Sequence, residues 1–336
     1  MIKRDFKPFG KVSSLTLGGG GIGGSWGTTK RAEAIATANL ALEMGIDHFD
    51  VAPLYGKGEA EKVLGKALSG KDPSNLHFTT KCLLGDIPNE QIFDRLETSL
   101  ARSMRNIGVE RIDLFLLHSQ LILDGTEELF RFNEFKAQLT TPISAYFDAV
   151  IPAFERLKEE GKIAHWGITG LGEQAAVIEA INHQAAPAAV QCVVNVLNSA
   201  GGLNCAAEDF DPRAILSACR EQQVPVLAIR AVQAGALTGS MDRELEDTDP
   251  DQADYKRAHR FRELASEWKE SPASLAHRYA LSIAGVSSVI LGTKNRPELQ
   301  DCLRAEQTGG LAPEEPRGRD HLLADAALPL ATADGL

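Results

Sequence analysis

Four polar residues stand at or just beyond the ends of three successive apolar segments. Asp50 ends IDHFD, Tyr55 follows it in a turn framed by proline and glycine, Lys81 ends HFTTK, and His118 ends IDLFLLH. Each of them alone is most often a structural residue, such as a buried acceptor or a satisfied core histidine. If the segments are neighbouring parallel strands, however, their carboxyl ends meet at one place. The joint placement therefore predicts a single site.

These residue types suit the reduction of a carbonyl group. A carbonyl that accepts a hydride needs a proton at its oxygen, and a phenol with a pKa of about 10 is a poor donor at neutral pH. A nearby ammonium favours the phenolate, and Lys81 is placed to supply that charge. We expect Asp50 to hold Lys81 by an ion pair and His118 to orient the carbonyl oxygen by a hydrogen bond.

The elements that must position these residues read as repeated βα units. Short apolar segments alternate with longer segments of helical period, which is typical of a parallel sheet. Eight strands are expected, at residues 14–17, 48–50, 76–81, 113–118, 163–169, 189–194, 226–229 and 288–291. This pattern predicts a (β/α)8 TIM barrel forming a single domain over residues 1–336, with its core at about 14–303 and a C-terminal tail at 309–336. Residues 1–13 are expected to form a short hairpin that closes the barrel floor.

Three longer connections interrupt this rhythm, at residues 120–142, 199–211 and 239–253. Each follows a strand end on the face where barrels of this kind place their active site, so we expect them to shape a substrate pocket or cover a cofactor. The acidic run MDRELEDTDPDQAD in the third is expected to be a solvated loop.

A glycine-rich segment offers a competing interpretation. LGGGGIGG places Gly18, Gly20 and Gly23 in GxGxxG spacing after a strand, with Asp50 at the end of the next one. In a doubly wound dehydrogenase a helix opens directly on such glycines, whereas here SWGTTK intervenes and no second half follows. In a barrel, Gly20 and Gly21 would instead let the backbone approach a flat ligand, or form a tight turn.

Composition excludes several classes of protein. The 336 residues carry a net charge of −11 and no basic run, which disfavours nucleic-acid binding. The five cysteines are dispersed and odd in number, so neither a disulfide framework nor a metal site is expected. The N-terminus lacks an apolar targeting segment and no stretch is long enough to span a membrane, so a cytoplasmic location is expected. HExxH and P-loop motifs are also absent.

The chain resembles the aldo-keto reductase superfamily. The resemblance runs from about residue 12 to 303 and rests on GIDHFDVAPLYG, HFTTK, RIDLFLLH, AHWGITG, AVQCVVN, AGALTG and VSSVILGTKNRPEL. It implies a catalytic tetrad at Asp50, Tyr55, Lys81 and His118. It also implies that a nicotinamide dinucleotide binds before a small carbonyl or alcohol substrate, such as an aldehyde, ketone or sugar. Oligomeric state, substrate and direction of reaction stay open.

The cofactor residues of the family match less completely. A Ser-Asn pair that holds the nicotinamide carboxamide is represented by Thr169 and Gly170, while Gln191 matches the second carboxamide partner. Where many members carry Tyr-Ser-Pro-Leu, this chain reads Ile-Arg-Ala-Val, which leaves Arg230 as a planar or phosphate-facing substitute. The resemblance further places these residues along the cofactor: Gly20, Gly21, Asp50, Ile229, Gly235, Leu237, Gly292, Thr293 and Asp301.

The segment after the eighth strand bears on cofactor choice. The family binds the ribose 2′-phosphate of NADP there with basic side chains, and GTKNRPELQD offers Lys294 and Arg296. We therefore expect NADP(H), with NAD(H) as the other possibility, since Glu298 stands where some NADP-specific members place an arginine. A cofactor-binding regulatory or sensor protein of the same fold is the alternative function.

Overall fold

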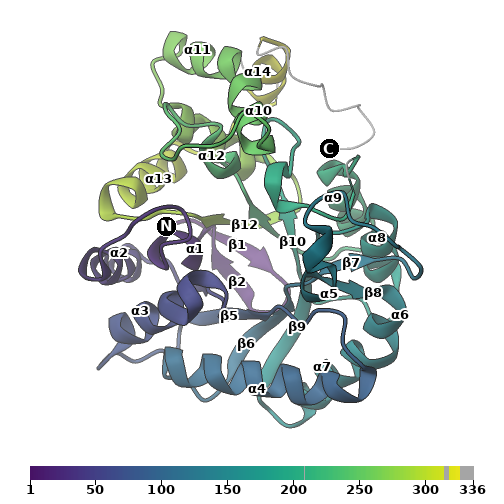
Figure 1. Ribbon diagram of the computed structural model, residues 1–336. Coiled ribbons are helices and arrows are strands. Elements are labelled where there is room, and N and C mark those ends of the chain that lie inside the picture. The colour runs from purple at the N-terminus through teal and green to yellow at the C-terminus, as the bar shows by residue number, and fades with distance from the viewer. Residues whose placement is uncertain (208, 314–317, 326–336) are drawn as a thin grey trace.

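The computed structural model describes residues 1–207, 209–313 and 318–325, and its centre is a closed barrel of eight parallel strands (Figure 1). The predicted (β/α)8 fold is confirmed, and the doubly wound alternative is wrong because the sheet closes on itself. The barrel strands are β3 (Leu15–Gly18), β4 (His48–Asp50), β5 (His77–Cys82), β6 (Ile112–Leu117), β9 (Ile163–Thr169), β10 (Val190–Val193), β11 (Val226–Ile229) and β12 (Val286–Leu291).

Strand register brings the expected carboxyl ends together. Gly18 of β3 pairs with Asp50 of β4, and Lys81 of β5 pairs with Leu116 of β6. The strands are buried along nearly their whole length, as expected where helices cover a parallel sheet. The observed ends differ from the expected ones by two residues or fewer.

A helix follows each barrel strand on the outside of the ring. These helices are α2 (Arg31–Glu43), α3 (Glu59–Leu68), α4 (Asn89–Ile107), α7 (Ile151–Glu159), α8 (Gln174–Asn182), α9 (Pro212–Glu221), α12 (Pro272–Ser282) and α13 (Arg296–Thr308). In α4 the buried residues Ile92, Leu96 and Leu100 share one face, and the helix stops at Gly108, whose φ is +83°. Among the described residues, every helix is too short or too polar to cross a bilayer.

The N-terminal hairpin closes the floor of the barrel, as predicted. Strands β1 (Lys3–Phe6) and β2 (Gly10–Ser13) pair antiparallel and are seen through the middle of the ring in Figure 1. Phe6 and Val12 pack against the inward-facing Leu114, Leu116 and Leu227. The hairpin thus supplies the apolar layer that the short barrel strands lack at this end.

The three longer connections, whose conformation the sequence left open, contain short regular elements. Residues 120–142 hold β7 (Gln120–Ile122), a 3-10 turn η2 (Asn133–Phe135), α5 (Lys136–Leu139) and β8 (Thr140–Pro142), with β7 and β8 paired parallel. Residues 199–211 contain the 3-10 turn η4 (Gly201–Leu203), and α10 (Pro250–Arg257) begins inside 239–253. Sequence periodicity is weak in such short elements, because one turn shows too few repeats.

The remaining elements lie around the barrel mouth and beyond the ring. They are α1 (Gly19–Ile22), the 3-10 turns η1 (Tyr55–Gly58) and η5 (Gln233–Gly235), α6 (Ile143–Ala145), the π-helical turn η3 (Tyr146–Val150), α11 (His259–Glu267) and α14 (Arg319–Asp325). α10, α11 and α14 group together outside the ring (Figure 1). In the tail that starts at Gly309, residues 314–317 and 326–336 lie outside the described residues.

Candidate active site

The four residues expected to form the tetrad meet at the carboxyl end of the barrel. Lys81 is fully buried, and its Nζ lies 2.5 Å from Asp50 Oδ1, 3.2 Å from the carbonyl oxygen of Val51 and 3.3 Å from the hydroxyl of Tyr55. The Tyr55 and His118 rings meet edge to face, with centroids 5.7 Å apart. One ammonium thus joins the carboxylate to the phenol, and the imidazole stands beside the phenol.

The position of Tyr55 depends on an unusual turn. Gly56, Lys57 and Gly58 follow it in the left-handed region, with φ of +60°, +56° and +88°. A Cβ on Gly56 would lie 2.1 Å from the carbonyl oxygen of Gly23, so only glycine fits there. The turn is therefore clamped against the chain that follows β3, and it holds the phenol over the barrel mouth.

Burial sets the protonation of the phenol. It raises the pKa of Tyr55; Lys81 acts in the opposite direction and Asp50 acts with burial. The sequence predicted the sign of the Lys81 effect, but the net shift is upward. Burial also lowers the pKa of Lys81, yet the Asp50 carboxylate and the phenol outweigh it and the pKa is raised. At neutral pH the site therefore contains a protonated phenol beside an ammonium.

His118 is electrically neutral and incompletely hydrogen-bonded. Burial, helped by the Lys81 charge, lowers its pKa to about 3. Its Nδ1 is buried and has no partner among the described residues. A neutral imidazole carries one N–H donor, so this ring can orient a carbonyl oxygen without adding charge.

Asp50 and Gln191 are joined by a hydrogen bond. Gln191 Nε2 donates to Asp50 Oδ2 over 2.5 Å, so the carboxylate accepts from Lys81 on one oxygen and from the amide on the other. Burial raises the pKa of Asp50 while Lys81 and Gln191 oppose that shift. Gln191, expected at the cofactor, thus also fixes the orientation of Asp50.

Thr169 ends β9, and its hydroxyl donates to the carbonyl oxygen of Leu117 on the neighbouring strand at 3.2 Å. The next residue, Gly170, has little free space, since a Cβ there would lie 2.9 Å from a methyl of Val190. The pair that replaces Ser-Asn is therefore packed into the barrel rim, with the Thr169 hydroxyl already engaged.

The glycine-rich segment permits close approach to protein atoms. A Cβ on Gly20 would lie 2.5 Å from the indole nitrogen of Trp26, and a Cβ on Gly21 would lie 2.1 Å from the carbonyl oxygen of Thr293. A Cβ on Gly292 would lie 3.4 Å from the same indole nitrogen. The GxGxxG spacing therefore reflects tight packing between the ends of β3 and β12. Sequence reasoning missed Trp26, whose indole lies between the ends of these two strands.

The chain after β11 has a strained backbone. Arg230, Gln233 and Ala234 have φ of +58°, +45° and +48°, which side chains with a Cβ rarely adopt. The Arg230 guanidinium donates to Ala200 O at 2.8 Å and to both oxygens of Asp251 at 2.9 and 3.0 Å. Its charge is therefore neutralised inside the protein, which the expected phosphate-facing role did not foresee.

Ile229, Gly235 and Leu237, which were also expected at the cofactor, flank Arg230 along the chain. Ile229 is the last residue of β11, Gly235 ends η5 with φ of +96°, and Leu237 is buried.

The acidic run has defined partners, and the solvated-loop prediction is wrong for several of its residues. Asp242 pairs with Lys294. Arg243 donates to Asp251 at 3.1 Å and to Ala234 O at 2.7 Å, and its guanidinium faces the Trp26 ring at 6.0 Å. Segment 241–243 therefore lies across the mouth from η5 to the end of β12. Only the fold reveals this, because an acidic run and a lysine far along the chain carry no pairing signal.

The segment after β12 and the first turn of α13 contain paired cations. Lys294 lies 3.7 Å from Glu298 besides its pairing with Asp242, and Arg296 is paired with Glu33. Glu298 itself accepts from the Lys294 N–H at 2.8 Å. Asp301 is paired with Arg304 on the exposed side of the helix.

Unpartnered atoms test whether the site fits a dinucleotide. His118 Nδ1, Arg230 Nε and the Thr293 hydroxyl are buried near strand ends at the mouth and have no hydrogen-bond partner among the described residues. Buried polar atoms are rarely left unpaired, so these three are candidate partners for a polar ligand at this end of the barrel, while Arg131 Nη1 and the Tyr146 hydroxyl are unpaired as well in the part of the chain that the structure describes. The residues present therefore fit a nicotinamide dinucleotide with its substrate.

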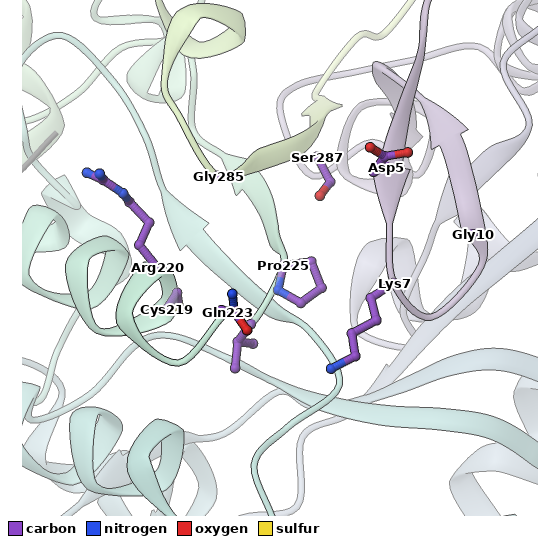
Figure 2. A pocket seen from close by; sticks show the side chains of 10 residues that line it. Asp5, Lys7, Gly10, Cys219, Arg220, Gln223, Pro225, Gly285 and Ser287 are labelled. Carbon is purple, nitrogen blue, oxygen red and sulfur yellow. The ribbon is translucent and has the colours of Figure 1, made fainter.

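A pocket of about 490 Å³ lies at the opposite end of the barrel. Figure 2 shows it between the hairpin and the chain before β11, where Lys7, Arg220, Gln223 and Ser287 line it. No residue of the tetrad contributes to this lining, so the pocket is separate from the candidate active site.

Comparison with known proteins identifies the family of this chain. Residues 14–317 match the aldo/keto reductase family. The chain belongs to this family. The sequence is 25% identical over 297 residues to L-galactose dehydrogenase of Arabidopsis thaliana, covering 88% of this chain and 84% of that protein. It is 27% identical over 215 residues to methylglyoxal reductase YeaE of Escherichia coli, covering 63% of each.

Solved structures agree on the fold. An aldo-keto reductase from Bacillus halodurans in its holo form superimposes with a TM-score of 0.70 at 22% identity, with 98% of each chain covered. The glycerol dehydrogenase of Gluconobacter oxydans gives a TM-score of 0.69 at 21% identity, also with 98% of each chain covered. The family resemblance seen in the sequence is thus confirmed, and membership supports the predicted oxidoreductase activity on a carbonyl or alcohol.

Proposed function

We propose that this aldo/keto reductase interconverts a carbonyl and an alcohol, with Tyr55 as the acid and base and Asp50, Lys81 and His118 as its supporting residues. The observation that carries the proposal is the buried chain from Asp50 through Lys81 to the Tyr55 hydroxyl, over 2.5 and 3.3 Å. A dinucleotide bound at the mouth supplies or accepts the hydride.

In the reducing direction, the Tyr55 hydroxyl donates its proton to the carbonyl oxygen. Burial keeps that proton on the phenol at neutral pH, and the Lys81 ammonium stabilises the phenolate that forms. Asp50 holds Lys81 in place by the ion pair, and Gln191 holds Asp50. The neutral His118 ring donates a hydrogen bond to the same oxygen. In the oxidising direction Tyr55 accepts the proton of the alcohol.

The test is a substrate panel of aldehydes, ketones and sugars, with the dinucleotide followed by its absorbance. Turnover of at least one substrate with either dinucleotide is expected, and loss of that turnover on Tyr55→Phe links it to this site. Binding of reduced dinucleotide without consumption of any substrate would instead favour the regulatory or sensor function.

The finer proposal concerns the dinucleotide. We propose that NADP(H) is preferred over NAD(H), with Lys294 and Arg296 as ligands of the 2′-phosphate and Thr293 as a hydrogen-bonding partner of the cofactor. What supports this is the presence of two cations, Lys294 just before α13 and Arg296 as its first residue. Asp242 and Glu33 pair with them, so the phosphate must compete with these carboxylates for its ligands.

The location is also a proposal, and a cytoplasmic one is favoured. The five cysteines are buried free thiols, which suits a reducing compartment. Fractionation of cells with an antibody to the protein tests this.

A further inference from the structure

Three donors of Arg296 converge on the carboxylate of Glu33. The backbone N–H and the Nε of Arg296 both donate to Glu33 Oε1 at 3.0 Å, and the terminal guanidinium nitrogen donates to Oε2 at 2.9 Å. Arg296 is the first residue of α13, where backbone N–H groups have no partner inside the helix. A guanidinium fork and a helix N-terminus together form a cradle for an anion. Here the anion is a side chain of the same protein.

The fold explains how residues so distant in sequence meet. β12 pairs with β3 in the closed barrel, so the helices that follow these strands are neighbours, and Figure 1 shows α13 beside α2. Glu33 lies in the first turn of α2 and reaches across to the first turn of α13. Hydrogen bonds from Arg296 lower the pKa of Glu33 to about 2, so the carboxylate is charged at every working pH.

We infer that Glu33 is a specificity-determining residue for the dinucleotide. Its carboxylate accepts the hydrogen bonds of Arg296 that the 2′-phosphate of NADP(H) would otherwise accept. This inference rests on the proposed function. NAD(H) carries a hydroxyl instead of a phosphate at that position and does not use these donors. Glu33 therefore lowers the affinity for NADP(H) and leaves the affinity for NAD(H) unchanged. The affinity for NADP(H) relative to NAD(H) is consequently lower than it would be if the donors of Arg296 were unoccupied. The pair is half exposed at Arg296, which allows the exchange of one anion for another.

Equilibrium binding tests the inference without relying on turnover. Calorimetric titration with NADP⁺ and NAD⁺ is compared for the unaltered protein and Glu33→Gln. The Kd for NADP⁺ is expected to fall about fivefold to tenfold, because an exposed ion pair is worth up to about fivefold and a like charge is also removed, while the Kd for NAD⁺ changes less than about twofold. Adenosine 2′,5′-bisphosphate is expected to gain affinity in the same way, and adenosine 5′-monophosphate is not.

Two further variants make the result specific. Glu43→Gln removes the same charge from the exposed far end of α2 and is expected to leave both Kd values unchanged. Arg296→Ala added to Glu33→Gln is expected to abolish the gain for NADP⁺. An equal change for both dinucleotides, no change, or the same change in Glu43→Gln would overturn the role of Glu33. If the unaltered protein binds neither dinucleotide, the proposed function itself fails, and the inference fails with it.

Discussion

Each end of the barrel contains a histidine, but the two rings differ in the hydrogen bonds of their nitrogens. At the floor, His48 Nδ1 lies 2.9 Å from the Thr16 hydroxyl and Nε2 lies 2.7 Å from the Thr79 hydroxyl. At the mouth, His118 Nδ1 has no partner among the described residues. Burial lowers the pKa of both rings to about 3. A shifted pKa therefore does not separate the structural histidine from the functional one, whereas the state of its hydrogen bonds does.

The same contrast applies to charge. The floor polar chain of Thr16, His48, Thr79 and Ser288 links neutral groups, and each side chain in it has a partner. The mouth instead buries an ammonium and a carboxylate, and leaves Nδ1 of His118, beside the phenol, unpaired among the described residues. Fully paired polar groups stabilise one structure, whereas an unpaired polar atom at the mouth is free to bond a ligand.

The largest effect on activity is expected from removal of the Tyr55 hydroxyl at the mouth of the barrel. Tyr55→Phe should lower kcat for carbonyl reduction by about 10²- to 10⁴-fold, because the proton donor is lost, and should leave the Kd of the dinucleotide within about twofold. Steady-state kinetics and calorimetry measure the two quantities.

Tyr146 provides the matched control and also the sharpest challenge to the comparison. Its hydroxyl is buried without a partner, but it lies in η3, on the outer layer of the fold. Tyr146→Phe should therefore leave kcat unchanged. A comparable loss of kcat in both variants would contradict the assignment of Tyr55 as the acid.

Lys81→Met tests the buried charge. Leaving Asp50 buried without its partner should lower the free energy of unfolding by about 3 to 5 kcal/mol, measured by urea denaturation. The pKa of Tyr55 should also rise further, because the cation that lowers it is gone while Asp50 still raises it. Alcohol oxidation needs the phenolate, so the limb of its pH profile that rises with pH should move to higher pH.

Adding Asp50→Asn to Lys81→Met should recover much of the stability but none of the activity. An unchanged pH profile in Lys81→Met with full activity would exclude the proposed action of Lys81 on the phenol.

The smallest expected effects are those of the two histidines, and they should be opposite in kind. His118→Leu should lower kcat/KM about 10²-fold, because the hydrogen bond to the carbonyl oxygen is lost. Stability should be nearly unchanged, because the buried Nδ1 makes no hydrogen bond among the described residues that the substitution could remove. His48→Leu should lower the free energy of unfolding by roughly 2 kcal/mol and retain kcat, because two buried threonine hydroxyls lose a partner. Reduction should also show no histidine titration between about pH 5 and 8, since His118 is neutral throughout. Loss of catalysis in His48→Leu at full stability would remove the distinction between floor and mouth.

Local pattern was sufficient for the barrel and for the gathering of the tetrad. Alternation of apolar and helical segments predicts βα units, and parallel closure forces strand ends such as Asp50 and Lys81 to one face whatever the details of the loops. The short elements of 120–142 were missed because a parallel pair as brief as β7 and β8 depends on contacts with the rim and leaves no periodic signal.

What the sequence determined by itself was therefore the set of strands, their order and the residues at their ends, because these follow from the period of burial along the chain. Only the tertiary structure decided which charges meet. Glu33 with Arg296 and Asp242 with Lys294 join residues on different barrel units, and Arg230 with Asp251 joins the end of β11 to a helix of the same unit. Barrel closure brings the first and last units together, and ion pairing depends on separation in space, which a linear pattern does not contain. The glycines after β3 show the same limit, since their GxGxxG spacing allowed a competing dinucleotide-fingerprint interpretation, while in the fold they pack against Trp26 and the end of β12.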